Sequence, residues 1–101
     1  MKTVRVDLGK RSYDILIGAG LLDRFHQLLE QYKTGKRIFL ISNAAVSRLF
    51  GKGLLQRLSE NGYQVTEIFI PDGEEHKTLE TVEEIYTALI TQRADRSSTL
   101  V

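Results

Sequence analysis

The residues from Pro71 to Lys77 are the strongest candidates for chemistry in this 101-residue chain. They read Pro-Asp-Gly-Glu-Glu-His-Lys and lie between a strand-like segment and a helix-like one. The carboxylate of Glu74 can accept hydrogen bonds from two hydroxyls of a ribose. Lys77 can donate a hydrogen bond to a hydroxyl or a phosphate. Lys77 follows Glu74 by three positions, so both side chains can face one ligand on an opening helical turn. Gly73 permits a positive φ and a close backbone approach.

The same segment has a purely structural interpretation. Asp72 with Glu75 fits a capping box, and acidic side chains in a first helical turn complement the helix dipole. Glu74 and Lys77 can equally form a surface ion pair that contributes little to stability. His76 is most simply a solvated turn residue. On the residues alone, the cap is slightly favoured over the ligand site.

Asn43 is a further candidate because of its position behind an apolar run. The segment 37–41 (Arg-Ile-Phe-Leu-Ile) is typical of a strand covered on both faces of a parallel sheet, and Ser42 and Asn43 follow it. Ligands of parallel sheets bind beyond the carboxyl ends of the strands. Asn43 can also cap the next helix, so a cap and a nucleotide contact both remain open for it.

The hydrophobic pattern predicts the elements that position these residues. Alternation over 4–8 and 11–18 predicts a β-hairpin that turns at Gly9 and Lys10. The other predicted elements are helices over 20–33, 44–60 and 79–90 and strands over 37–41, 63–70 and 98–101. Gly51 and Gly53 are expected to break or bend the second helix. The alternation of strands and helices predicts one α/β domain with a parallel sheet and right-handed crossovers.

Composition excludes several classes of function. The net charge of +1 gives no electrostatic case for nucleic acid or an anionic membrane as a partner. There is no cysteine, so disulfides, thiolate metal sites and a cysteine nucleophile are excluded. The two histidines, His26 and His76, are too far apart in sequence to predict a metal site. No apolar run approaches the ~20 residues of a membrane helix, and a cytoplasmic location is expected.

Several short stretches, taken in order, resemble one enzyme family. They are Leu8-Gly9, Arg11–Tyr13, Ile17–Leu22, Ser42-Asn43, Leu49–Gly51, Ile70–Lys77 and Asp95–Leu100. The most specific is Ile70–Lys77, which matches the pattern Asp-Gly-Glu-x-x-Lys. The family is that of the 3-dehydroquinate synthases, and the resemblance to its N-terminal part runs from one end of the chain to the other.

The resemblance implies a Rossmann-like, NAD-binding domain over residues 1–101. It implies that Asp72, Gly73, Glu74 and Lys77 contact the dinucleotide and that Asn43 faces it. The family's enzymes are lyases of the shikimate pathway, which leads to the aromatic amino acids. They convert 3-deoxy-D-arabino-heptulosonate 7-phosphate to 3-dehydroquinate and phosphate, with NAD reduced and regenerated in the cycle. A zinc or cobalt ion and most substrate contacts belong to a helical C-terminal domain.

The resemblance also implies what this chain lacks. The chain stops inside its last predicted strand, before the family's glycine-rich pyrophosphate loop, so a truncated domain is expected. It would carry no catalytic residue and no metal ligand and would be inactive alone. An open sheet edge at Ser98–Val101 and uncovered helix faces predict self-association, and a homodimer is expected. Two alternatives stay open: a related cyclase such as a deoxy-inosose synthase, or a non-catalytic α/β module that binds a nucleotide or a protein partner.

Overall fold

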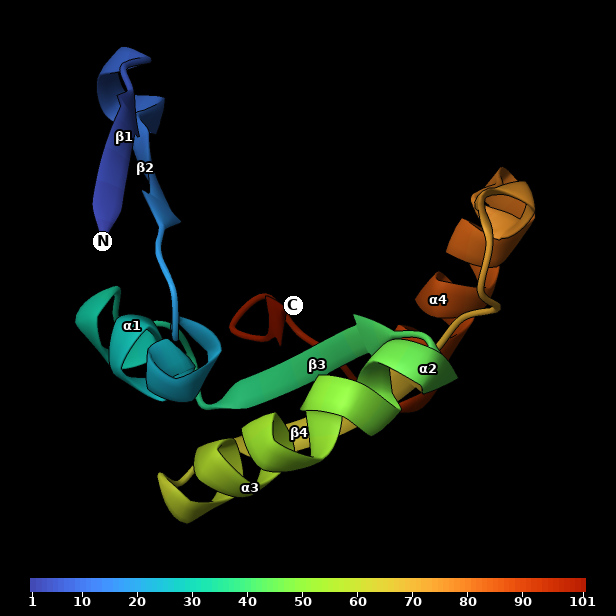
Figure 1. Ribbon diagram of the computed structural model, residues 1–101. Helices are drawn as coiled ribbons and strands as arrows, with labels where there is room; N and C mark the ends of the chain where they lie inside the picture. The colour runs from blue at the N-terminus through green and yellow to red at the C-terminus, as the bar shows by residue number, and fades with distance from the viewer.

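The computed structural model describes every residue from Met1 to Val101 and contains two separate sheets (Figure 1). Strands β1 (Lys2–Val6) and β2 (Tyr13–Ile17) pair antiparallel, with Val4 opposite Ile15. The predicted hairpin is therefore confirmed. Its connection is longer than a two-residue turn, because Gly9–Arg11 form a 3₁₀ turn and the hydroxyl of Ser12 accepts from the backbone N–H of Leu8 at 2.8 Å.

The second sheet is parallel and has the order β4-β3-β5. Its strands are β3 (Arg37–Ser42), β4 (Gln64–Phe69) and β5 (Thr99–Leu100). Residue Ile38 of β3 lies opposite Val65 on one side and Thr99 on the other. The chain places β4 on one side of β3 and then returns to place β5 on the other side. The strand order therefore reverses at β3, and such a switch point is where open α/β sheets bind ligands.

Helices connect the strands, as the periodicity predicts. They are α1 (Phe25–Gln31, after the 3₁₀ turn Leu22–Arg24), α2 (Ala44–Val46), α3 (Lys52–Glu60) and α4 (Leu79–Thr91). The predicted break near Gly51 takes another form, because a π-helical turn, η3 (Ser47–Gly51), joins α2 to α3 without a stop. Gly51 is buried there, and a Cβ atom on it would lie 2.7 Å from the Ser47 hydroxyl oxygen. The helix therefore widens where Gly51 lies close to Ser47. Glycine tolerates this contact because it has no Cβ atom.

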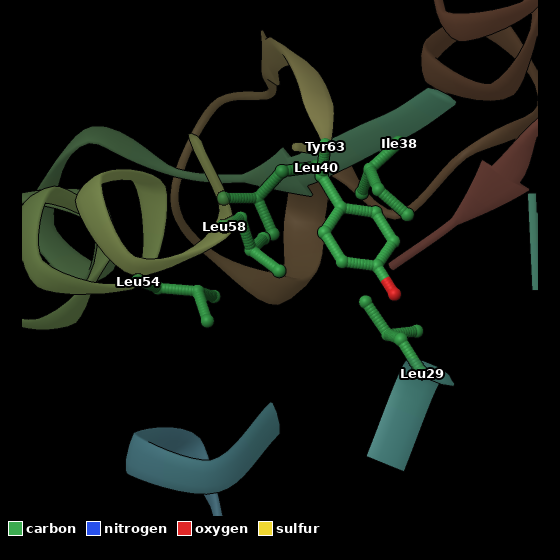
Figure 2. Close-up of a cluster of buried hydrophobic side chains, with 6 residues drawn as sticks. All are labelled: Leu29, Ile38, Leu40, Leu54, Leu58 and Tyr63. Carbon is green, nitrogen blue, oxygen red and sulfur yellow. The ribbon is translucent and has the colours of Figure 1, made fainter. Parts of the chain in front are cut away.

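The core lies between α3, α1 and one face of β3 (Figure 2). It consists of six buried side chains, Leu29, Ile38, Leu40, Leu54, Leu58 and Tyr63. Figure 2 shows the ring of Tyr63 beside Ile38, with Leu29 approaching from α1. On the other face of β3, Phe39 is fully buried. Burial of one such side chain contributes about 1.5–3 kcal/mol, so this cluster fixes the sheet.

A loop at the amino end of β5 packs against the start of β3. Gly35 lies so close to the carbonyl oxygen of Ser97 that a Cβ atom would stand 2.1 Å from it. The carboxylate of Asp95 accepts from the backbone N–H of Ser97 at 2.9 Å and from its hydroxyl at 2.7 Å. The loop therefore holds β5 beside β3 through backbone contact. None of the helices combines the length and the apolar character that crossing a membrane requires.

Candidate functional site

The carboxyl ends of β3 and β4 meet through one side-chain contact. Asn43 follows β3, and its Nδ2 donates to Oδ1 of Asp72, which follows β4, at 3.3 Å. The side-chain oxygen of Asn43 also accepts from the backbone N–H of Val46 at 2.8 Å and so caps α2. The cap predicted for Asn43 is confirmed, and the same side chain brings the two predicted site segments together.

The backbone turns sharply at Gly73, which has φ 111° and ψ 148°. A side chain at that φ would be strained, so the predicted use of glycine for a positive φ is confirmed. The chain then forms a 3₁₀ turn, η4 (Glu74–His76), with Glu74 and Glu75 in its first turn. The turn presents these side chains to solvent at the carboxyl edge of the sheet.

The predicted capping box of Asp72 with Glu75 is wrong. Helix α4 begins later, at Leu79, and its cap is Thr78, whose hydroxyl accepts from the backbone N–H of Thr81 at 3.2 Å. The Asp72 carboxylate instead accepts from Asn43. A threonine directly before the apolar pattern of α4 was the sequence signal for this cap.

Glu74 and Lys77 form the ion pair that the structural interpretation predicts. Lys77 Nζ donates to Glu74 Oε1 at 2.9 Å, and the side chains are 67% and 85% exposed for Lys77 and Glu74 respectively. A pair this exposed contributes at most about 1 kcal/mol to stability. Both charged groups remain open to a ligand, and the bond engages one of the two carboxylate oxygens.

A groove of about 410 Å³ runs along the start of α4 beside this pair. Its apolar wall includes Ile70, Val82 and Ile85, while His76 and Lys77 stand among its polar lining. The sequence prediction named Lys77 but missed the apolar wall. The signal was available, because Ile70 directly follows β4, and Val82 and Ile85 follow helical spacing in α4.

The remaining charged groups do not extend this site. No group of three or more His, Cys, Asp or Glu side chains is arranged to hold a metal ion. Asp95 has a lowered pKa, chiefly because the hydroxyl and backbone N–H of Ser97 donate to its carboxylate. Asp95 lies before β5, at the amino edge of the parallel sheet. Its hydrogen bonds with Ser97 stabilise the loop there.

Comparison with known proteins leads to the same family as the motif resemblance. No family model matches the chain. It is 45% identical over 103 residues to 3-dehydroquinate synthase of Pseudomonas putida (strain W619) and 43% identical over 103 residues to that of Pseudomonas fluorescens (strain SBW25). This chain is similar to 3-dehydroquinate synthases along its whole length. It spans about 27% of the length of these relatives, so the resemblance predicted from the motifs is confirmed for a part of such a protein.

Solved structures agree on the fold. A 2-deoxy-scyllo-inosose synthase complexed with carbaglucose-6-phosphate, NAD+ and Co2+ matches with a TM-score of 0.77 over 98% of this chain and 26% of that one. A second structure of 2-deoxy-scyllo-inosose synthase matches with a TM-score of 0.75 over 98% of this chain and 28% of the other. Both are 19% identical to this chain, so they support the assignment of the fold alone. The α/β architecture predicted from the sequence is confirmed.

Proposed function

We propose that residues 1–101 supply one wall of the NAD site of a 3-dehydroquinate synthase. Such an enzyme converts 3-deoxy-D-arabino-heptulosonate 7-phosphate to 3-dehydroquinate and phosphate in the shikimate pathway. The observation that carries the proposal is the contact between Asn43 and Asp72 at 3.3 Å, which joins two strand ends beside the switch point. The identity of 43–45% to 3-dehydroquinate synthases supports the choice of enzyme.

The residues at this edge suit the adenosine half of NAD. The Glu74 carboxylate can accept hydrogen bonds from ribose hydroxyls, the role of the acidic residue in dinucleotide-binding sheets. Lys77, held at 2.9 Å from that carboxylate, can donate to a hydroxyl or a phosphate oxygen. Gly73 turns the backbone at a positive φ, with the Glu75 carboxylate lying against it, and Asp72 is oriented by Asn43. The neighbouring groove offers an apolar wall to a flat base.

The proposal assigns binding, and not catalysis, to this chain. NAD supplies the reversible hydride acceptance of the cycle when it is bound. The residues here orient the ribose and hold its hydroxyls, while the divalent metal, zinc or cobalt, and the sugar-acid phosphate substrate are assigned to a longer protein. The chain alone is expected to be inactive and to bind NAD weakly, because none of the described loops provides a glycine-rich pyrophosphate cradle.

A related cyclase is the second candidate. The two solved structures compared above are 2-deoxy-scyllo-inosose synthases, one of them complexed with NAD+ and Co2+. Their 19% identity is well below the 43–45% shared with 3-dehydroquinate synthases, which favours the first candidate. An assay of a longer protein that contains these residues, with each sugar phosphate in turn, distinguishes the two.

An NAD titration of the ¹⁵N-labelled chain tests where the dinucleotide binds. Dissociation in the millimolar range, about −4 kcal/mol, is expected, with amide shifts confined to Asn43, residues 72–77 and the start of α4. A Thr3→Ala variant, changed at an exposed position of the distant hairpin, serves as the control and should give the same map. Shifts that avoid residues 72–77, or micromolar affinity without a pyrophosphate loop, would contradict the proposal.

A further inference from the structure

Helix α3 ends in a turn that requires a glycine directly after its C-cap, Asn61. The backbone N–H of Gly62 donates to the carbonyl oxygen of Ser59 at 3.2 Å. The backbone N–H of Tyr63 donates to the carbonyl oxygen of Leu58 at 3.0 Å, and the two bonds together form a Schellman motif. In this motif the residue after the cap is left-handed, and Gly62 has φ 85°. Any other residue would be strained there, so the fold fixes the pair Asn-Gly at this turn once the cap is asparagine.

The core holds both sides of this turn, whereas its tip is open to solvent. Leu58 and Tyr63 belong to the buried cluster and are 0% and 5% exposed (Figure 2). A hydrophobic contact between these two positions commonly accompanies the motif. Asn61 and Gly62, which lie between them, are both exposed. Water therefore reaches the Asn-Gly pair, while the residues on either side of it are held in place.

An exposed asparagine followed by glycine can lose its side-chain amide without an enzyme, and asparagine is among the thermolabile residues. The backbone nitrogen of the glycine forms a bond to Cγ of the asparagine and gives up its proton. The bond from Cγ to Nδ2 breaks, and the nitrogen leaves as ammonia with that proton. Water then opens the cyclic imide. Opening at one carbonyl gives aspartate, and opening at the other gives isoaspartate, whose main chain runs through Cγ.

The closed turn opposes this reaction in three ways. The Gly62 N–H, which must lose its proton, is bonded to Ser59. Nδ2 of Asn61, the leaving group, donates to the carbonyl oxygen of Arg57 at 2.7 Å. The ψ angle of Asn61 is 18°, which directs the Gly62 nitrogen away from the Asn61 side chain. Ring closure therefore needs the turn to open and ψ to rotate.

We propose that Asn61 is a site of spontaneous modification and that opening of the α3 turn sets the rate of its conversion to aspartate and isoaspartate. Each product weakens the turn. Aspartate places a negative charge at the C-terminus of a helix, where the helix dipole disfavours it, and it has no N–H to donate to Arg57. Isoaspartate lengthens the main chain between Leu58 and Tyr63, which the core holds in place.

The location of the turn makes this inference independent of the proposed NAD site. The turn directly precedes β4, which begins at Gln64, and so lies at the amino edge of the parallel sheet. The candidate ligand residues Asp72–Lys77 follow the other end of the same strand. A modification at Asn61 therefore acts on the α3 side of the fold and leaves the ligand-binding edge intact.

Peptide mapping by mass spectrometry tests the site and its control by the turn. The chain is incubated in a mildly alkaline buffer, both folded and unfolded in guanidinium chloride. Conversion of Asn61 is expected in both samples and should be at least about tenfold faster in the unfolded one. The ratio of the two rates should agree, within about threefold, with the hydrogen-exchange protection of the Gly62 amide, because both reactions need the same opening. Asn43, the other asparagine of the chain, precedes Ala44 and should stay unmodified.

Two substitutions at the same position sharpen the test. Asn61→Asp carries the product charge and should speed hydrogen exchange of the Gly62 amide about two- to fivefold. Asn61→Gln is the matched control, because it keeps a neutral amide whose longer side chain closes a larger ring less readily. It should show neither conversion nor faster exchange.

Three results would overturn the proposal. Equal conversion rates in the folded and unfolded chain, or a ratio unrelated to the protection of Gly62, would mean that the turn does not control the reaction. Conversion of Asn43 as fast as that of Asn61 would mean that the Asn-Gly turn is not a distinct site. Unchanged exchange in Asn61→Asp would mean that the product does not weaken the turn.

Discussion

Helices α3 and α4 both connect strands of the parallel sheet, yet they bury very different surfaces. Helix α3 places Leu54 and Leu58 in the core against β3. Thr81 is the one buried residue of helix α4, and Leu79 and Ile90 are largely exposed. Both helices have an apolar pattern in sequence. The difference teaches that stability is concentrated around α3, whereas the α4 side carries the groove, the candidate ligand pair and several exposed apolar side chains.

Core truncation should separate the two sides most strongly. Leu58→Ala is expected to lower the free energy of unfolding by about 2–5 kcal/mol, because Leu58 is fully buried among well-packed side chains. Leu79→Ala on α4 should change it by less than about 0.5 kcal/mol. Urea denaturation followed by circular dichroism measures both. Equal losses in the two variants would contradict the proposed division of stability.

The contact between Gly35 and Ser97 should have the next largest effect. Gly35→Ala places a Cβ atom 2.1 Å from a backbone oxygen, and the backbone shift this forces should cost about 1–3 kcal/mol. Gly53→Ala is the control, since a Cβ atom there meets nothing within 4 Å and alanine favours a helix. Thermal unfolding should show the first variant less stable than the native chain and the second equally or more stable. A Gly35→Ala chain as stable as Gly53→Ala would contradict this close packing.

Loss of the α4 cap should have a smaller effect. Thr78→Ala removes the acceptor for the backbone N–H of Thr81 and should cost about 1 kcal/mol. Asp72→Ala should leave the helical content of α4 unchanged, because Asp72 bonds to Asn43 and not to the helix. Amide hydrogen exchange in the first turn of α4 measures both. Faster exchange in Asp72→Ala than in Thr78→Ala would mean that Asp72, and not Thr78, caps the helix.

The pH dependence from Asp95 should be the smallest effect. Its pKa is lowered in the folded chain by the hydrogen bonds from Ser97, so the unfolded chain binds the proton more readily. The stabilisation is therefore complete above the ordinary aspartate pKa, near pH 4, and is lost as the pH falls through the lower, folded pKa. Urea unfolding between pH 2 and pH 6 should show a shallower acid loss in Asp95→Asn. An identical pH profile in that variant would contradict the assignment.

Most of the fold was predictable from local pattern. The alternation in 4–8 and 11–18 and the apolar run at 37–41 are sufficient to predict the hairpin and β3, which the structure confirms. The π-helical turn at Ser47–Gly51 was not predictable, because it depends on how closely Gly51 packs against Ser47. The exposure of Leu79 was equally unpredictable. Periodicity shows that an apolar side chain lies on one face of a helix, but it does not show what covers that face.

The candidate site was predictable in its residues and less so in its geometry. Spacing alone indicated that Glu74 and Lys77 face each other, and they form an ion pair. The bond between Asn43 and Asp72 joins residues 29 positions apart and depends on the register of β3 against β4. The capping prediction failed because Gly73 turns the chain and delays the helix to Leu79.

The most direct test of the central claim, that Glu74 binds NAD, compares the NAD affinities of two carboxylate variants. Glu74→Ala should weaken NAD binding at least about fivefold, roughly 1 kcal/mol, with the free energy of unfolding nearly unchanged, because its ion pair is exposed. Glu75→Ala, the neighbouring carboxylate in the same turn, should retain the native affinity. Loss of stability in Glu74→Ala with unchanged NAD affinity would contradict the account and leave the pair with a structural role alone.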